Sequence, residues 1–220
     1  MSVATVQSEF PRQFVKPEAE FGEWAVAEPY FKALGERPIA SAADFEKWLI
    51  DWSELESCFD EEGTKRYTAM TCQTDDAERL QRHMHFIENV APHAEPWRDM
   101  LRRKLIEHAG KLSLPAKRYE VLLRSVRNTI ELYREENIPL MAENQKLSTE
   151  YQQITAAMTV TYNGEELTLQ QIAKYQEEPD RKIREMTWRL AADRFLQDSD
   201  KLDELYVKMV HLRHKIAQNA

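Results

Sequence analysis

Residues 41–59 read SAADFEKWLIDWSELESCF, and this stretch decides the class of fold. Ser41 followed by Asp44 has the spacing of a capping box, in which the two side chains accept backbone N–H groups at the start of a helix. Large apolar residues then recur every three or four positions, as they do on one face of an α-helix. They are Phe45, Trp48, Leu49, Trp52, Leu55 and Phe59. The stretch therefore predicts a helix that buries one face.

The same pattern continues downstream. Asp75 with Glu78 repeats the capping spacing, and apolar residues again recur at helical intervals behind it. Pro92 and Pro96 are expected to mark the start of the next helix, because proline is tolerated in a first turn. Two antiparallel helices are thus expected, the first of them beginning at residue 41.

Two residues near the middle of the chain predict a boundary between helices. Gly110 is expected to end a helix in the left-handed conformation, and Pro115 to open another. Short connections between helices favour antiparallel neighbours, so residues 41–157 are expected to form one helical layer.

One segment departs from the helical pattern. Residues 158–162, MTVTY, alternate apolar and polar side chains and are followed by Asn163 and Gly164. A type I′ turn needs positive φ at both central positions, which Asn and Gly tolerate best. The sequence therefore predicts a small β-hairpin over about residues 158–168, after which Thr168 caps a short helix.

The chain ends in a long helical pattern that begins at Asp180. Uninterrupted, this helix would span roughly 60 Å, although residues 197–200 allow a break in it. Its apolar face still includes Val210 and Ile216, so we expect further chain or a partner to cover it.

Residues 1–40 have a different character. Four prolines interrupt the segment, yet it is rich in Phe, Tyr and Trp, in which disordered arms are poor. We expect an arm that packs on the body of the protein. The expected organisation is this arm, the helical layer of residues 41–157, and a hairpin with a long helix over residues 158–220.

Composition agrees with an all-α protein, an antiparallel helical array with one small hairpin. Only 5 Gly occur in 220 residues, and the formal charge of −8 disfavours binding to nucleic acid, which needs clustered Lys and Arg. No apolar run is long enough to span a bilayer. Cys58 and Cys72 are too few for a disulfide framework, so both are expected to be buried small side chains in a cytoplasmic protein.

The sequence offers only a weak match to a metal-binding motif. The zinc-peptidase sequence HExxH does not occur, and His211-x-x-His214 is the nearest substitute, with Asp203, Glu204 and Glu107 as acidic residues that could complete a ligand set. No general-base Glu lies between these histidines. We therefore expect polar residues of an amphipathic helix there and no bound metal.

The other polar clusters predict no chemistry. His83 and His85 would lie on nearly opposite faces of a helix and are expected at the surface, while His93 and His108 have no nucleophile in a recognisable context. Paired carboxylates are expected at helix ends or solvent-exposed faces. They are Asp60-Glu61-Glu62, Asp75-Asp76, Glu135-Glu136 and Glu177-Glu178. No catalytic, cofactor-binding or metal-binding residue is predicted.

Several short segments of the sequence resemble those of a known protein family. Residues 157–169, AMTVTYNGEELTL, and 179–185, PDRKIRE, resemble the N-terminal region of oligoendopeptidase F-type members of the M3 (thimet-like) metallopeptidase family. Residues 133–140, YREENIPL, and the segment 66–75 are similar to segments in the same region. The resemblance spans roughly residues 41–220.

The resemblance implies a fold and a function. Members of this family are elongated helical proteins in which an N-terminal helical layer and a C-terminal catalytic domain enclose a channel for short peptides. Zinc is held there by the two His of HExxH and a later Glu, and a general-base Glu activates the zinc-bound water. This chain would form a channel wall, bind no zinc itself and be inactive without a catalytic domain, either one that follows residue 220 or one in a second subunit. The alternative is a free-standing, non-catalytic helical binding or scaffold protein.

Overall fold

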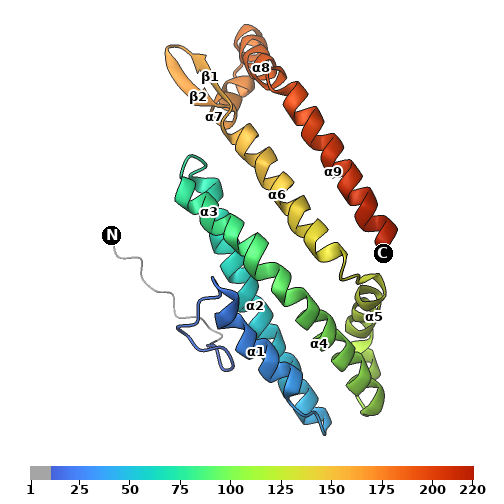
Figure 1. Cartoon of the computed structure of the whole chain (residues 1–220). Helices are drawn as coiled ribbons and strands as arrows, with labels where there is room; N and C mark the ends of the chain where they lie inside the picture. Colours follow the sequence, from blue (N-terminus) through green and yellow to red (C-terminus); the bar gives the residue numbers. More distant parts are fainter. Residues whose placement is uncertain (1–10) are drawn as a thin grey trace.

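Helices lie side by side in a computed structural model that describes residues 11–220 (Figure 1). The helices are α1 (Trp24–Glu36), α2 (Ala42–Cys72), α3 (Ala77–His85), α4 (Ala91–Lys111), α5 (Ala116–Leu132), α6 (Asn137–Ala156), α7 (Leu169–Ala173), α8 (Arg181–Leu196) and α9 (Ser199–Asn219). Strands β1 (Thr159–Tyr162) and β2 (Glu165–Thr168) form one antiparallel pair. The predicted fold class, all-α with one small hairpin and a long C-terminal helix, is confirmed.

Two groups of helices make up this arrangement (Figure 1). Helices α1 to α5 share one apolar core, whereas α6 to α9 and the hairpin bury two smaller apolar clusters of their own. We call these groups the N-terminal unit and the C-terminal unit. Their cores are separate, so the contact between them must be made by other side chains.

Helix α2 begins as its sequence predicts. The N–H of Asp44 donates to Oγ of Ser41 at 3.1 Å, and the N–H of Ser41 donates to Oδ2 of Asp44 at 3.0 Å, which completes the capping box. The helix continues for 31 residues, to Cys72. Cys58 is buried, but Cys72 is exposed at the last turn, so the prediction that both thiols are buried is wrong for Cys72.

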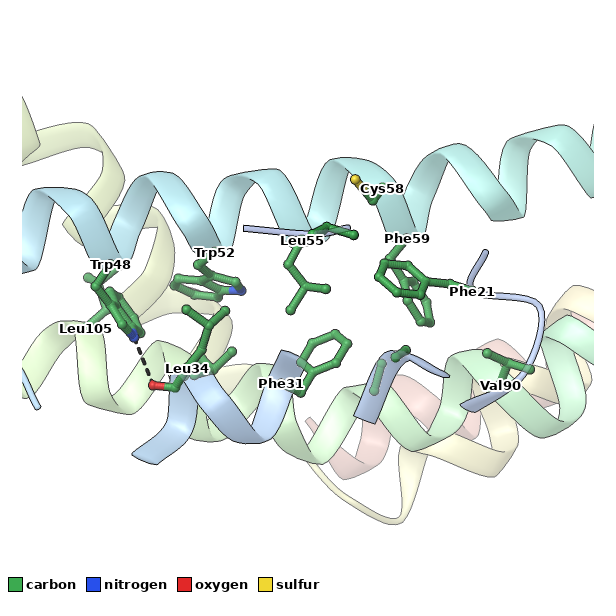
Figure 2. Packing of buried hydrophobic residues seen from close by; sticks show 14 of the residues in the cluster. Phe21, Phe31, Leu34, Trp48, Trp52, Leu55, Cys58, Phe59, Val90 and Leu105 are labelled. Carbon is green, nitrogen blue, oxygen red and sulfur yellow. Dashed lines mark hydrogen bonds between the residues drawn. The ribbon is translucent and has the colours of Figure 1, made fainter. Parts of the chain in front are cut away.

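The core of the N-terminal unit forms where α2 crosses α1 and α4 (Figure 2). Trp48 is fully buried, and its indole N–H donates to the carbonyl oxygen of Leu34 at 3.0 Å, so its polar atom is satisfied inside the core. Phe59 packs edge-on against Phe31 with ring centroids 5.9 Å apart. Each fully buried side chain of this size contributes about 1.5–3 kcal/mol through the apolar surface that it removes from water.

The start of the chain described by the structure also packs on α2. The backbone N–H groups of Gln13, Phe14 and Val15 all donate to the carboxylate of Glu54, at 2.7–3.0 Å. Phe21, a little further along, is buried in the same core. Residues 1–10 lie outside the described part of the chain.

A π-helical turn, Phe86–Val90, joins α3 to α4 without a break. The N–H of Ala91 donates to the carbonyl of Phe86, five residues earlier, and this wider turn accommodates Pro92, which has no N–H and would crowd an ordinary α-turn. Pro92 therefore lies at the start of α4 as expected, but it does not separate two helices. Pro96 lies inside α4.

Two predicted helix signals fall on the wrong residues. The N-cap of α3 is Asp76, not Asp75, and its side chain accepts the N–H groups of Glu78 and Arg79. Gly110 lies inside α4, whose last residue is Lys111, and Leu112, directly after the helix, is extended. No left-handed residue is needed, because the chain leaves this helix in an extended conformation.

The hairpin agrees with its prediction. Asn163 and Gly164 have φ of 52° and 83°, both positive, as a type I′ turn requires. Thr168 then forms a capping box with Gln171 at the start of α7. Helix α8 follows with Asp180 as its N-cap.

The long C-terminal pattern is two helices, since the turn at residues 197–198 separates α8 from α9. Helix α9 runs antiparallel to α6 (Figure 1). Its inner face is covered by α6 and the residues after it, whereas Val210 is 44% exposed. The apolar residues in contact are Leu147, Ile154, Met158, Leu202, Leu205 and Met209. None of the helices formed by residues 11–220 is long and apolar enough to cross a membrane.

Candidate functional site

The histidines of α9 do not build a metal site. His211 and His214 are both exposed, and Glu107 belongs to α4, where its carboxylate pairs with Lys111. Asp203 and Glu204 are exposed on α9. Within residues 11–220, no three His, Cys, Asp or Glu side chains converge in a way that could hold a metal ion.

His83 and His85 occupy different environments. His85 is partly exposed, and its Nε2 lies 3.0 Å from a carboxylate oxygen of Glu23. His83 is only 3% exposed, so the prediction of a surface position is wrong for this residue. Burial, together with the nearby guanidinium of Arg66, lowers the pKa of His83. Helix α6 covers it, which the spacing within α3 could not reveal.

Neither remaining histidine in α4 has a nucleophile beside it. His93 stacks on Trp24 with ring centroids 5.9 Å apart, and Nδ1 of His108 lies 3.0 Å from the carbonyl oxygen of Lys104. The His93 ring thus packs α4 against α1, whereas the contact of His108 lies within α4 itself.

The carboxylates of residues 60–62 lie in the middle of α2. Asp60 and Glu61 are exposed there, so they occupy the solvent-exposed face that was the second of the two expected positions. Glu62 pairs with Arg66 at 2.6 Å, and Glu61 pairs with Lys65 and Arg12, which lower the pKa of its carboxyl. The pair of Arg12 with Glu61 ties the start of the described chain to α2, while the other two pairs lie within that helix.

A groove of about 580 Å³ opens beside these ion pairs. Its lining includes Arg12, Glu61, Glu62, Arg66 and Cys58. Burial raises the pKa of the Cys58 thiol, which disfavours the reactive thiolate. The charged lining groups named here are paired with one another, so the groove offers no activated nucleophile.

Two exposed apolar strips lie on the C-terminal helices. The α9 strip consists of Tyr206, Val207 and Val210, which are 66%, 50% and 44% exposed. The spacing of these residues places them on the opposite face of α9 from Leu205, with His214 one turn further along the same face. Because Leu205 packs against Ile154 of α6, this face points away from α6.

The α8 strip consists of Trp188, Phe195 and Leu196, which are 58%, 41% and 64% exposed. Arg181 and Arg184 lie beside Trp188 in a shallow hollow. Exposed apolar side chains grouped on one face are typical of a surface that packs against another protein or domain. These strips are the candidate functional site.

Sequence periodicity identified one apolar face on this part of the chain and missed the second. The sequence predicts Val210 on a single apolar face with Ile216, whereas Val210 lies on the exposed face with Tyr206 and Val207. Trp188, Leu196 and Val207 were not recognised at all. The spacing of Tyr206, Val207 and Val210 was the available signal, because it defines a face of its own.

Comparison with known proteins gives one match over part of the sequence and several over the whole fold. Residues 15–133 match the family described as the peptidase M3 N-terminal domain. No curated protein shows significant similarity to the chain.

Three solved structures share the fold. A structure described as oligoendopeptidase F has a TM-score of 0.77 and 23% identity, over 94% of this chain and 37% of that one. One from Bacillus anthracis str. Ames, also described as oligoendopeptidase F, has a TM-score of 0.70 and 20% identity, over 96% and 38%. PZ peptidase A, solved with an inhibitor, has a TM-score of 0.70 and 23% identity, over 96% and 36%. The chain thus spans little more than a third of the length of these structures.

Proposed function

The chain belongs to the M3 peptidase family, and from this premise we propose that it is the N-terminal helical portion of a zinc-dependent oligoendopeptidase. The complete enzyme would hydrolyse internal bonds of short peptides, with this chain forming one wall of the peptide channel. The family match, which covers more than half of the chain, carries the proposal. The fold shared with oligoendopeptidase F and PZ peptidase A supports it.

Zinc does not fit the residues of this chain. The sequence contains no HExxH, and residues 11–220 hold no group of side chains that could bind a metal ion. We therefore assign no step of peptide hydrolysis to this chain. Its role in the proposal is to shape the channel and to pack against the polypeptide that carries the metal.

The α8 and α9 strips are the surface that we assign to this packing. Their six side chains are each at least 41% exposed, and burying apolar surface contributes about 25 cal/mol per Å². The structures that share this fold are almost three times as long as the matched region, so a large part of each lies outside it. A catalytic part as large as the unmatched part of these structures would have ample surface to cover both strips.

A reconstitution experiment tests the proposal. The 220-residue chain is purified alone and also joined to an HExxH-containing part, whether that part follows residue 220 or belongs to a second subunit, and hydrolysis of a fluorogenic peptide of about eight residues is followed. We expect chelator-sensitive hydrolysis only when both are present. Zinc-dependent hydrolysis by the 220-residue chain alone would contradict this division of roles.

Surface variants provide the matched control. Tyr206→Ser with Val210→Ser should weaken association with the catalytic polypeptide, because both side chains belong to the α9 strip. Lys208→Ser, an exposed residue of the same helix outside the strip, should leave association unchanged. A chain that binds peptides or a second copy of itself, and never supports hydrolysis, would favour the alternative of a helical binding protein.

A further inference from the structure

Three polar contacts connect α6 to the N-terminal unit. Nζ of Lys146 lies 2.9 Å from Oε1 of Glu88, in the π-helical turn. Oγ1 of Thr149 lies 3.4 Å from Nε2 of His83. Furthest along α6, Nε2 of Gln152 lies 2.8 Å from the hydroxyl oxygen of Tyr67, in α2. The three α6 residues are three positions apart and so follow one face of the helix. We call this set of contacts the α6 seam.

The middle contact fixes which nitrogen of His83 carries its proton. The hydroxyl of Thr149 also lies 3.0 Å from the carbonyl oxygen of Gln145 and donates its only hydrogen there. Nε2 of His83 must therefore donate to Thr149, which leaves Nδ1 as an acceptor. Nδ1 is buried and has no partner.

The seam contains a second unsatisfied acceptor. Nε2 of Gln152 donates to the hydroxyl of Tyr67 at 2.8 Å, while Oε1 of Gln152 is buried without a partner. Among the described residues, three buried side-chain polar atoms lack a hydrogen bond, and two of them lie in this seam. Each such atom costs about 1–3 kcal/mol in lost solvation. The contact between the two units is therefore less stable than the apolar core within each unit.

Packing next to the seam is also incomplete. A groove of about 270 Å³, open to solvent, lies between α4 and α6 and is lined mainly by apolar side chains. Ile87 and Pro92 form one side of it, and Ile138 and Met141 the other. The two helices therefore do not close fully over one another beside the polar contacts.

Protonation of His83 would add a charge that nothing in the seam compensates. Helix α2 presents Arg66, whose guanidinium pairs with Glu62, together with the Tyr67 hydroxyl. Helix α6 presents Thr149 and the cation Lys146, which pairs with Glu88 and Glu143. No carboxylate of the described residues lies within hydrogen-bond distance of the imidazole.

We propose that the α6 seam is a proton-operated joint, in which protonation of His83 separates α6 from α3 and lets the two units move as intact bodies. The neutral imidazole favours the closed joint. Protonation of His83 places a cation beside Arg66 and adds a hydrogen to the buried Nδ1, which has no acceptor nearby. In an open joint, water would solvate both the charge and this N–H group. The proposal does not depend on the peptidase function.

The direction of the pH dependence follows from this environment. In the closed joint the pKa of His83 lies below its ordinary value of 6.5, and exposure to water returns it towards that value. The open joint thus binds more protons, so the closed form is favoured above pH 6.5 and is progressively lost as the pH falls below it.

Energy transfer between two dyes tests the proposal. One dye is attached to Cys72, which is exposed in the N-terminal unit, and the other to the thiol introduced by Lys208→Cys in α9, with Cys58→Ala to prevent a third label. From about pH 7.5 to about pH 5, where histidine is the side chain that ordinarily changes charge, we expect transfer to change with a midpoint below 6.5. Helical circular dichroism should stay constant.

Two variants separate His83 from the other histidines. His83→Gln keeps an N–H donor but cannot be protonated, and it should abolish the change in transfer. His85→Gln, two residues away, should retain it. Constant transfer in the parent chain, or a change that persists in His83→Gln, would overturn the proposal, and so would a parallel loss of helicity.

A third variant serves in case His83→Gln does not fold. Thr149→Val removes the acceptor of the Nε2 hydrogen bond and so destabilises only the closed joint. Its midpoint should move to higher pH than that of the parent chain. An unchanged or lower midpoint would count against a joint that includes this bond.

Discussion

The ammonium nitrogen of Lys104 lies 2.9 Å from the carbonyl oxygen of Leu34, which precedes it by 70 residues. The same nitrogen donates to the carbonyl of Gly35 at 2.8 Å and also to that of Arg37. The last carbonyls of a helix have no partner within it, and a cation there also interacts favourably with the helix dipole. Lys104 thus caps the end of α1 from within α4.

Replacing Lys104 with Met should lower the free energy of unfolding by about 2 kcal/mol, because carbonyls at a partly buried helix end lose a charged donor. Urea unfolding followed by circular dichroism measures the change. Lys111→Met is the matched control, since Lys111 forms only an exposed pair with Glu107, and it should cost less than about 0.5 kcal/mol. Equal effects of the two variants would rule out the capping role.

Two glycines should respond to alanine in opposite directions. Gly164 has a φ of 83°, so Gly164→Ala should destabilise the hairpin by about 1 kcal/mol. Gly110 lies inside α4 with open space where a Cβ would be, so Gly110→Ala should stabilise the protein by about 0.5–1 kcal/mol. Thermal unfolding of both variants checks the pair. Destabilisation by Gly110→Ala would mean that α4 ends before this residue.

Two adjacent residues of α9 should differ sharply in their contribution to stability. Leu205 is 3% exposed and packs against α6, and Leu205→Ala should cost about 2–4 kcal/mol. Tyr206 is 66% exposed, and Tyr206→Ala should cost less than about 0.5 kcal/mol in the isolated chain. Chemical unfolding of the two variants compares them. A large loss for Tyr206→Ala would show that the α9 strip is already covered.

The N-cap of α2 offers a fourth test. Ser41→Ala removes one half of the capping box and should cost about 1 kcal/mol. Ser57→Ala, in the middle of the same helix, removes only a hydroxyl that bonds to the carbonyl of Ser53, and it should have little effect. The difference between the two midpoints in urea gives the contribution of the cap, and no difference would exclude it.

The features predicted correctly from the sequence depend on neighbouring residues alone. Ser41 and Asp44 meet within one helical turn, and Asn163 with Gly164 makes a turn whose geometry these two residues favour by themselves. Such signals act over three or four positions, so they hold in almost any surroundings.

The features that were missed depend on residues far away in the sequence. His83 is buried because α6, more than 60 residues later, covers it through Thr149. Similarly, α9 has two apolar faces, and only its packing on α6 shows which of them is buried and which forms the α9 strip. Periodicity within one helix cannot distinguish these cases.

The π-helical turn at Phe86–Val90 constrains how sequences of this kind can change in length. Deleting one residue within α3 would rotate all of α4 by about 100° and would take Ala94, Leu101 and Leu105 out of the core. The π-helical turn holds one residue more than an α-turn, so deleting one residue there would leave an ordinary α-turn with these side chains still facing the core. The loop at residues 73–76 lies outside any helix and can lengthen without such a rotation. Among related sequences, insertions and deletions should therefore collect in that loop, and between the start of α3 and the end of α4 they should be confined to single residues at the π-helical turn.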